Sequence, residues 1–421
     1  MHAPASRSEV IYLDNNATTR IAPEVFEAMV PFLTEHYGNP SSAYSFGKRV
    51  EGHLIEARAK VASILGCTPK EIIFTSCGTE SDNAAIWSAL QTTGKKHIVT
   101  TEVEHSAVMN QTEWLEKNGY GVTRLPVAPD GTLSVADVEK AIRDDTAIVS
   151  IMWANNETGV LFPVEEIATL CKKKGVLFHT DAVQTPGKID LCGVAKSDID
   201  FLSMSGHKLH APKGVGVLYV KKRTKIVPYV IGGGQERGKR GGTENVASIV
   251  GLGRAAELAL EKLSDEQTRV RALRDRFEDA LLKRLPNLYI NGKRDQRLPN
   301  TTNIAFDFVE AEAILMMLDR NGICASSGSA CTTGSLDPSH VLSAMGLTPA
   351  RARSCVRFSF SHYNTDADID YALKIIPPMI EQLRAMSPLN ADHPDNFNYD
   401  VEAAREKEEK LMAQTMAAIN E

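Results

Sequence analysis

The chain has 421 residues, a net charge of −6 and a pI near 6.0. Its length favours two or three domains, and its 43% hydrophobic, 24% charged composition is typical of a folded globular protein. This balance excludes a global basic surface for nucleic acid or anionic lipid, and no apolar run reaches the roughly 18 residues of a transmembrane helix. We expect a cytoplasmic protein without nucleic-acid or membrane partners, because the N-terminal residues also lack an apolar signal segment.

Residues 71–220 alternate short β-branched runs with helical patterns. This alternation predicts an α/β fold with a mostly parallel sheet and helices on both faces. One helix is expected over 163–174, since Pro163 opens that segment and Gly175 closes it. A Gly/Val-rich strand is expected to end at Val220. The strands expected before it cover 71–75, 97–100, 147–152, 176–180 and 199–202.

The pattern changes after the Gly-rich segment 232–243, which is expected to be a loop. Long charged helices such as 264–285 follow, with strand-like segments at 302–308 and 355–360. We predict a large α/β domain over 18–263, and a smaller α+β domain formed by 1–17 and 264–388. Residues 389–421 are expected to be a tail with a linker and a charged helix.

The seven cysteines are scattered and odd in number, and they contain no CxxC pair, which is unlike a disulfide framework or a structural zinc site. We expect reduced thiols. Cys331 differs from the others because it stands in a Gly/Ser/Thr segment without apolar periodicity. From the residues alone, both an inert exposed thiol and a nucleophile remain open, because reactivity depends on the thiolate fraction.

Polar residues follow each of the first five expected strands. Ligands of parallel sheets bind in the crevice outside the carboxyl ends of the strands, so these runs predict a shared binding site. The runs are 76–79 (SCGT), 102–105 (EVEH), 154–157 (ANNE), 181–184 (DAVQ) and 205–208 (SGHK).

These residues suit pyridoxal 5'-phosphate (PLP), which needs a lysine for its aldehyde, a carboxylate for its pyridine nitrogen and donors for its phosphate. Lys208 and Asp181 can meet the first two needs from adjacent strand ends. Gly78 and Thr79, at a strand-to-helix turn, offer backbone N–H groups and a hydroxyl to the phosphate. Ser205 and His207 can add side-chain donors.

A metal site is the competing interpretation of His207 and His210. Two histidines at this spacing need a helix and a third ligand, whereas Gly206 and Pro212 favour a turn. We therefore expect no metal here.

Six segments, in this order, resemble the cysteine desulfurases, a branch of the class-V aminotransferases with the type I fold of PLP enzymes. The resemblance covers residues 10–388, and the wording of 152–166 and 331–341 is most similar to the nitrogen-fixation (NifS-like) branch. The segments are 12–19 (YLDNNATT), 74–81 (FTSCGTES), 154–159 (ANNETG), 179–184 (HTDAVQ), 205–208 (SGHK) and 326–331 (SSGSAC).

The resemblance implies a role for each matching residue. Lys208 would bond covalently to PLP, Cys331 would be the nucleophile and His105 would be a third catalytic residue. Arg357 would bind the substrate carboxylate, a task that suits its planar guanidinium, and Asn156 would also bind the substrate. Contacts with the PLP ring are implied for His105, Asn156, Asp181 and Gln184, and contacts with the phosphate for Gly78, Thr79, Ser205, His207 and, from a neighbouring subunit, Thr243.

The implied reaction removes sulfur from L-cysteine, giving L-alanine and a persulfide on Cys331. The implied partners are a second copy of the chain and an iron–sulfur scaffold that accepts the sulfur, with nitrogenase assembly as the context. Selenocysteine cleavage is an alternative, as is a non-enzymatic sulfur carrier or iron–sulfur scaffold. One departure from the family pattern is His362, where arginine is expected, so the charge beside the substrate carboxylate is expected to differ.

Overall fold

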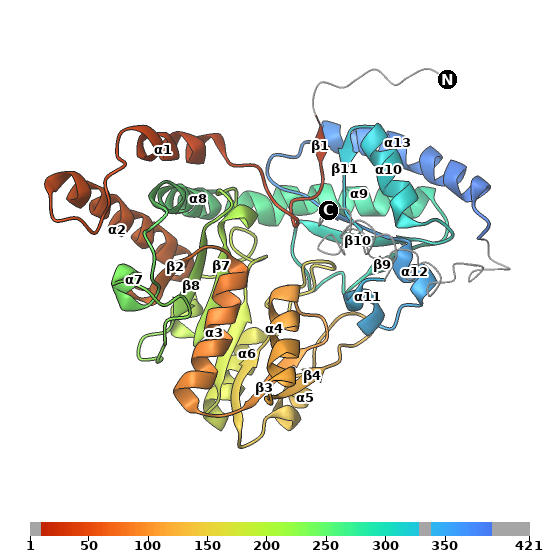
Figure 1. Ribbon diagram of the computed structural model, residues 1–421. Coiled ribbons are helices and arrows are strands. Elements are labelled where there is room, and N and C mark those ends of the chain that lie inside the picture. The colour runs from red at the N-terminus through yellow and green to blue at the C-terminus, as the bar shows by residue number, and fades with distance from the viewer. Residues whose placement is uncertain (1–9, 328–337, 390–421) are drawn as a thin grey trace, which may run out of the picture.

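The computed structural model describes residues 10–327 and 338–389. Its main sheet has seven strands in the order β2-β8-β7-β6-β5-β3-β4 (Figure 1), and β8 runs antiparallel to both of its neighbours while the other pairs are parallel. The five strands predicted first and the later Gly/Val strand are confirmed. The strands are β2 (Ile72–Thr75), β3 (His97–Thr101), β4 (Gly121–Leu125), β5 (Thr146–Ser150), β6 (Leu177–Asp181), β7 (Phe201–Ser205) and β8 (Gly216–Val220).

Strand β4 was not predicted. It lies at the edge of the sheet, and four of its five residues are partly exposed, so its sequence lacks the continuous apolar run of the central strands. Strand β8 lies between β2 and β7 and is antiparallel to both. Strand β2 therefore runs in the same direction as the parallel strands, and its carboxyl end lies at the same edge of the sheet as theirs.

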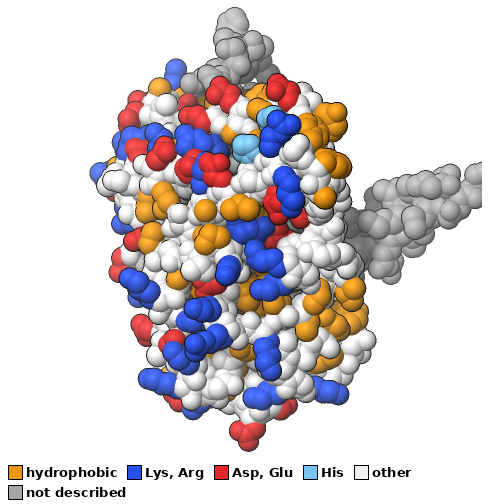
Figure 2. Space-filling model, turned by 90° about the vertical axis from the view of Figure 1, so that its left-hand side faces the viewer, with side chains coloured by type: hydrophobic (Ala, Val, Ile, Leu, Met, Phe, Trp, Pro, Cys, Tyr) orange, Lys and Arg blue, Asp and Glu red, His pale blue; other side chains and the backbone are white. Residues whose placement is uncertain are grey.

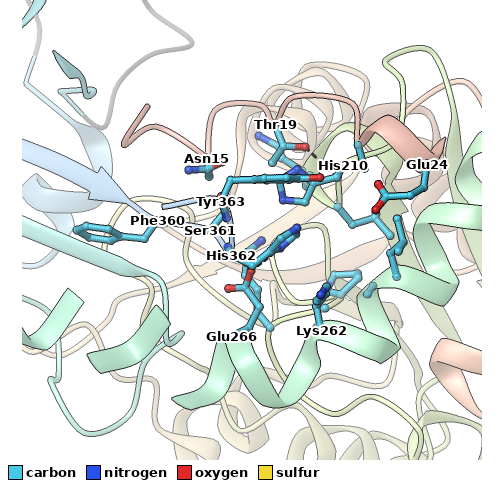
Figure 3. Close-up of a pocket in the computed structure, with 18 residues that line it drawn as sticks. Asn15, Thr19, Glu24, His210, Lys262, Glu266, Phe360, Ser361, His362 and Tyr363 are labelled. Atoms are coloured by element: carbon cyan, nitrogen blue, oxygen red, sulfur yellow. Dashed lines mark hydrogen bonds and ion pairs between the residues drawn. The ribbon is translucent and has the colours of Figure 1, made fainter. Parts of the chain in front are cut away.

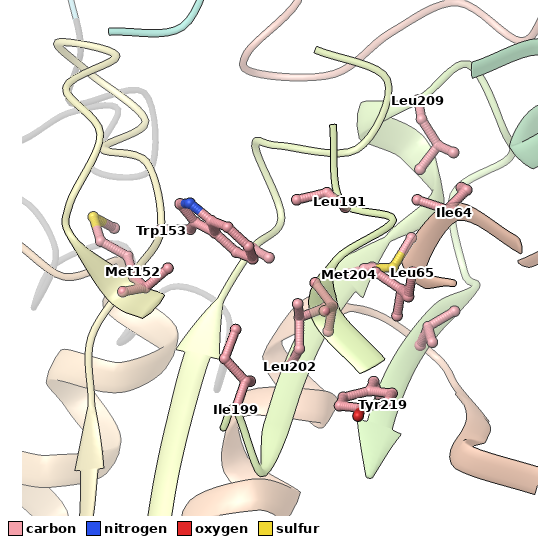
Figure 4. Packing of buried hydrophobic residues seen from close by; sticks show 14 of the residues in the cluster. Ile64, Leu65, Met152, Trp153, Leu191, Ile199, Leu202, Met204, Leu209 and Tyr219 are labelled. Carbon is pink, nitrogen blue, oxygen red and sulfur yellow. The ribbon is translucent and has the colours of Figure 1, made fainter. Parts of the chain in front are cut away.

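Helices cover both faces of the sheet, as predicted, because alternate strand residues point to opposite faces. Ile148 and Phe201 pack on one face with α3 (Gly78–Thr93) and α4 (Ser106–Lys117). Leu202 and Met204 join the larger core on the other face, near Leu65 (Figure 4). That core also takes side chains from α1 (Pro23–Thr34), α2 (Ser45–Leu65), α5 (Val135–Ala141), α6 (Val164–Lys174) and α8 (Val246–Asp265).

Helix α6 confirms the prediction for residues 163–174. Pro163 is its N-cap, and Gly175 ends it in the left-handed region with φ of 68°. Glutamates lie in its first turn and lysines in its last turn, which complements the helix dipole.

A second apolar core joins the two ends of the described chain. Strand β1 (Ile11–Tyr12) pairs in parallel with β11 (Ile323–Cys324), and Ile11 packs in this core with Phe277 and Phe358. An antiparallel sheet of β9 (Leu288–Asn291), β10 (Thr301–Phe306) and β12 (Cys355–Ser359) lies beside it, and β10 and β12 confirm two predicted strands. The helices of this part are α9 (Arg271–Arg284), α10 (Ala311–Arg320), α11 (His340–Ala344), α12 (Pro349–Arg353) and α13 (Asp366–Met386).

A helix was predicted to begin at residue 264, but in the structure the helical segment begins earlier, at Val246. A continuous helical rod runs through α8, a π-helical turn at Glu266–Val270, and α9. The sequence changes from an apolar to a charged pattern within this rod, because α8 packs in the larger core and α9 in the smaller one. The division of the chain into domains at residue 264 stays a proposal, as does the tail, which lies outside the described residues.

The Gly-rich loop 232–243 is tied to the main sheet by a buried ion pair. Within it, helix α7 (Gln235–Gly238) contains Glu236 and Arg237 in the left-handed region, at φ of 46° and 61°. Both carboxylate oxygens of Glu236 accept from Arg58 at 2.6 Å, and one also accepts from the backbone N–H of Phe74 at 3.0 Å. The loop is therefore anchored to β2.

Removing this anchor should destabilise the fold. Arg58→Met keeps most of the packing volume but leaves a buried carboxylate without its cation, which typically costs about 3 kcal/mol or more of unfolding free energy. Urea unfolding of the purified variant measures this. The control is Lys48→Met, which breaks the exposed Lys48–Glu51 pair and should cost under about 1 kcal/mol. Equal losses in the two variants would contradict the anchoring role.

No helix in residues 10–327 or 338–389 is long and apolar enough to cross a membrane.

Candidate active site

The polar strand ends line one cavity of about 280 Å³ at the carboxyl edge of the parallel strands. The sheet order places β2, β7, β6 and β5 so that their ends converge there, as the sequence predicted. Ten of the predicted site residues line this cavity: Gly78, Thr79, His105, Asn156, Asp181, Gln184, Ser205, His207, Lys208 and Arg357.

Lys208 ends a short 3-10 turn, Gly206–Lys208, directly after β7. Its Nζ donates to the carbonyl oxygens of Asn16 and Ala17, the latter at 2.8 Å. The neighbouring His207 shares a 3.1 Å hydrogen bond with the hydroxyl of Thr18. The segment after β1 thus holds the turn and directs the lysine amine into the cavity.

Asp181 ends β6 and is buried. Its Oδ1 accepts from the backbone N–H of Val183 at 2.8 Å. Burial raises the pKa of this carboxyl, while His105, the hydrogen bond from Val183 and Lys208 act to lower it. A cationic ring nitrogen beside Asp181 would supply the counter-charge that this buried carboxylate needs.

Residues of the first turn of α3 line the cavity. Gly78 is the first residue of this helix, whose free N–H groups favour an anion. A Cβ at Gly78 would come within 2.7 Å of Val183 Cγ2, so the close approach of the chain requires glycine. Burial lowers the pKa of His207 to about 4, so at neutral pH its ring contributes hydrogen bonds rather than charge.

Arg357 lies on β12 and is only 2% exposed. Its two terminal nitrogens donate to Asp14 Oδ1 at 2.8 Å and to the carbonyl of Asn156 at 2.9 Å. Its Nε has no hydrogen-bond partner within the described part of the chain. This buried guanidinium is thus held in place with donor capacity left for a carboxylate.

His105 and Gln184 complete the walls. His105 is the N-cap of α4, and its Nδ1 accepts from the N–H of Ala107 at 3.2 Å, which fixes the ring. Gln184 donates through Nε2 to the carbonyl of Asn16 at 3.0 Å, and its buried Oε1 has no partner among the residues described.

The comparisons with known proteins agree with this geometry. The Aminotransferase class-V family model matches residues 11–372. Cysteine desulfurase 2 of Trichormus variabilis is 54% identical over 92% of this chain and 97% of its own length, and cysteine desulfurase NifS of Azotobacter vinelandii is 52% identical over 90% and 94%. A solved NifS-like protein has a TM-score of 0.83 at 40% identity, over 89% of this chain and all of that one.

The chain belongs to the cysteine desulfurases of the class-V aminotransferase family. The predicted fold class and the predicted cofactor, PLP, are confirmed by this membership. The cavity fits PLP on its own evidence as well. It offers a lysine amine, a buried carboxylate and an amide oxygen of Gln184 that has no hydrogen-bond partner among the residues described. It also offers the N-terminus of helix α3, where Gly78 leaves no space for a side chain.

Sequence reasoning assigned no role to three desulfurase site residues that the structure reveals. Asn16 accepts from Lys208 and Gln184 through its carbonyl, and Asp14 orients Arg357. Asp82 of α3 lines the cavity, and burial, followed by the charge of Asp181, raises the pKa of its carboxyl. The run of polar residues that follows Tyr12 could have indicated a role for Asp14 and Asn16 from the sequence.

The described lining of this cavity does not include three residues named from the sequence. Thr243 is exposed and does not line the described cavity, and Cys331 lies outside the described residues. The expectation for His362 is wrong, because this residue lines a second cavity rather than the one that contains Arg357. Strand β12 ends at Ser359, and His362, three residues further on, contacts Glu266. Among the described residues, no group of three or more His, Cys, Asp or Glu side chains is placed to hold a metal ion.

Proposed function

We propose that this desulfurase removes the sulfur of L-cysteine, with Lys208 and Arg357 acting on the substrate and Cys331 receiving the sulfur. The observation that carries this proposal is the convergence of Lys208, Asp181 and Arg357 on one buried cavity. A lysine amine, a buried carboxylate and a buried guanidinium provide cofactor attachment, ring-charge balance and carboxylate binding, respectively.

Each side chain has a defined task in this reaction. Bound PLP supplies an electron sink for the pair left on the substrate Cα. Arg357, held by Asp14, binds the substrate carboxylate and so fixes the orientation of the Cα–H bond. The Lys208 amine, when it is free, would remove the Cα proton of the substrate and return it. His105, fixed at the start of α4, would lie against the cofactor ring.

Cys331 is the proposed sulfur acceptor. Its thiolate attacks the substrate sulfur, so the substrate C–S bond breaks and an S–S bond forms. The electron pair of the broken bond stays with the substrate carbon skeleton, which takes up a proton and leaves as alanine. No external oxidant is needed, because the substrate carbon is reduced while the two sulfur atoms are oxidised to a persulfide.

Cys331→Ala should abolish this transfer. Wild-type enzyme incubated with cysteine and a thiol reductant should release equal amounts of alanine and sulfide, whereas the variant should lose at least about 10²-fold in rate while cysteine still alters the cofactor absorbance. Cys192→Ala, which removes an exposed thiol, is the control and should keep full activity. Normal turnover by Cys331→Ala, or sulfide released with pyruvate instead of alanine, would overturn the assignment.

Several wider expectations rest on the family relationship and stay proposals. They are a homodimer in which Thr243 reaches the partner's phosphate site, an iron–sulfur scaffold as sulfur acceptor, service to nitrogenase assembly, and a cytoplasmic location. The exposed position of Thr243, on a loop anchored to β2, is compatible with a contact in a second copy. Size-exclusion chromatography of the holoenzyme, with and without Thr243→Ala, tests the first of them.

A further inference from the structure

A second cavity, of about 290 Å³, has His210, Glu266 and His362 in its lining (Figure 3). Residues of the segment after β1 and of the turn that carries Lys208 line both cavities. The side chains of His210 and His362 have no part in the proposed reaction.

A buried carboxylate lies on one side of this cavity. Glu266 is 6% exposed, and its Oε1 accepts from the backbone N–H of His362 at 2.9 Å and lies 3.1 Å from the Nδ1 of the same residue. Its buried Oε2 has no hydrogen-bond partner among the described residues. Leaving such an oxygen unpaired typically costs about 1–3 kcal/mol, so the site favours a donor from a ligand.

Local backbone geometry also marks this position. Glu266 is the first residue of the π-helical turn between α8 and α9. Such turns are rare and occur frequently at functional sites, where they re-aim a side chain. The helical rod therefore changes from α-helical to π-helical geometry at Glu266, which lines the cavity.

An ammonium group lies in the same cavity. Lys188 is 6% exposed, and its Nζ donates to the carbonyl of Gln184 at 3.0 Å, which uses one of its three hydrogens. Burial lowers the pKa of Lys188 to about 8, while Glu266 acts to raise it, so the amine is still mostly protonated at neutral pH. It can thus bind an anion.

His210 adds a neutral acceptor. Its Nδ1 lies 3.1 Å from the carbonyl of Arg20 and so carries the proton, which leaves Nε2 as an acceptor. Burial lowers its pKa to about 3. Its ring meets that of His362 edge-on, with centroids 4.7 Å apart. Leu209, Leu258 and Ala259 supply an apolar wall.

We propose that this cavity binds a free α-amino acid with a small side chain. An α-amino acid carries an ammonium group for Glu266 and a carboxylate for Lys188 on one carbon, and the apolar wall leaves room for a methyl-sized side chain. A simple anion or a simple cation would satisfy only one of these two buried groups. This assignment rests on the second cavity alone and not on the reaction proposed for the first.

Occupancy of the second cavity would reach the first through hydrogen bonds. Lys188 holds the carbonyl of Gln184, the side chain of Gln184 donates to the carbonyl of Asn16, and Lys208 donates to that same carbonyl. A ligand carboxylate that binds the amine of Lys188 would therefore alter, through these hydrogen bonds, the position of Lys208, which binds the cofactor.

The test is calorimetric titration of L-alanine into holoenzyme whose lysine–cofactor bond has been reduced with borohydride, so that the added amine cannot displace Lys208. We expect one binding event, unchanged in Arg357→Lys and about tenfold or more weaker in Glu266→Gln and Lys188→Met. Acetate alone and ethylamine alone should each bind about tenfold more weakly than alanine. Glu24→Gln, at an exposed position of the lining, should change the affinity less than about threefold.

Ala259→Leu provides a second route if the charge variants fold poorly, because its added carbons occupy the cavity without changing its charge. It should abolish alanine binding while the cofactor absorbance is retained. Absence of binding to the reduced wild-type holoenzyme, binding lost only in Arg357→Lys, or binding unchanged in both Glu266→Gln and Ala259→Leu would overturn the proposal.

Discussion

Replacing Lys208 with alanine is expected to lower kcat for cysteine desulfuration at least about 10³-fold. The variant loses both the covalent attachment of PLP and the amine proposed to move the Cα proton. In the structure the Nζ of Lys208 is directed by the carbonyls of Asn16 and Ala17. The cofactor should still bind without covalent attachment, because Asp181 and the first turn of α3 remain in place.

Three measurements separate this role from a structural one. Borohydride should fix the cofactor covalently to the wild type but not to Lys208→Ala. Ethylamine should restore part of the activity of the variant, since a small amine can occupy the space left by the side chain. Lys213→Ala, which removes an exposed lysine five residues further on, should keep activity within about twofold. A borohydride-stable cofactor adduct on another lysine of Lys208→Ala would refute the assignment.

Replacing Asp181 with asparagine should lower kcat by about 10²–10³-fold with a smaller change in KM. The amide oxygen can still accept the N–H of Val183, so the local geometry is kept and only the charge is lost. Without a carboxylate beside it, the cofactor's ring nitrogen loses the partner that stabilises its protonated form. The absorbance of the bound cofactor should change with the rate.

Glu104 offers a matched control for Asp181. It is also fully buried, and it accepts from the hydroxyl of Thr101 at 2.7 Å and the N–H of Met152 at 3.1 Å. Burial raises its pKa to about 8, which is above neutral pH, so its carboxyl is mostly protonated and uncharged at pH 7. Glu104→Gln should therefore change kcat less than about threefold at pH 7. Equal losses in the two variants would show that Asp181 acts through packing rather than charge.

Much of the candidate site could be predicted from the sequence because its chemistry is local to strand ends. Lys208 and Asp181 each follow a short β-branched run, and parallel strands bring their carboxyl ends to one edge. The helix at 163–174 was likewise predictable, since Pro163 and Gly175 mark its ends within a few residues.

Features that depend on distant pairing could not be predicted in this way. Asp14 accepts a hydrogen bond from Arg357, which lies 343 residues further along the chain. The carbonyl of Asn16 accepts one from Lys208, which lies 192 residues further along. No periodicity or capping pattern links such positions. The contact of Asp14 with Arg357 arises because β1 and β12 pack in the core that joins the two ends of the chain.

The sequence by itself determined which groups are available for chemistry and on which strand ends they stand, because alternating side chains and turn residues act over a few neighbours. Only the tertiary structure decided which groups share a cavity. It placed His362 beside Glu266 instead of Arg357, and it separated Lys188 from Asp181, seven residues before it, into a different cavity. The physical reason is that the burial and pairing of charges depend on how separate elements pack. A single turn of the chain is enough to place residues that are close in sequence in different cavities.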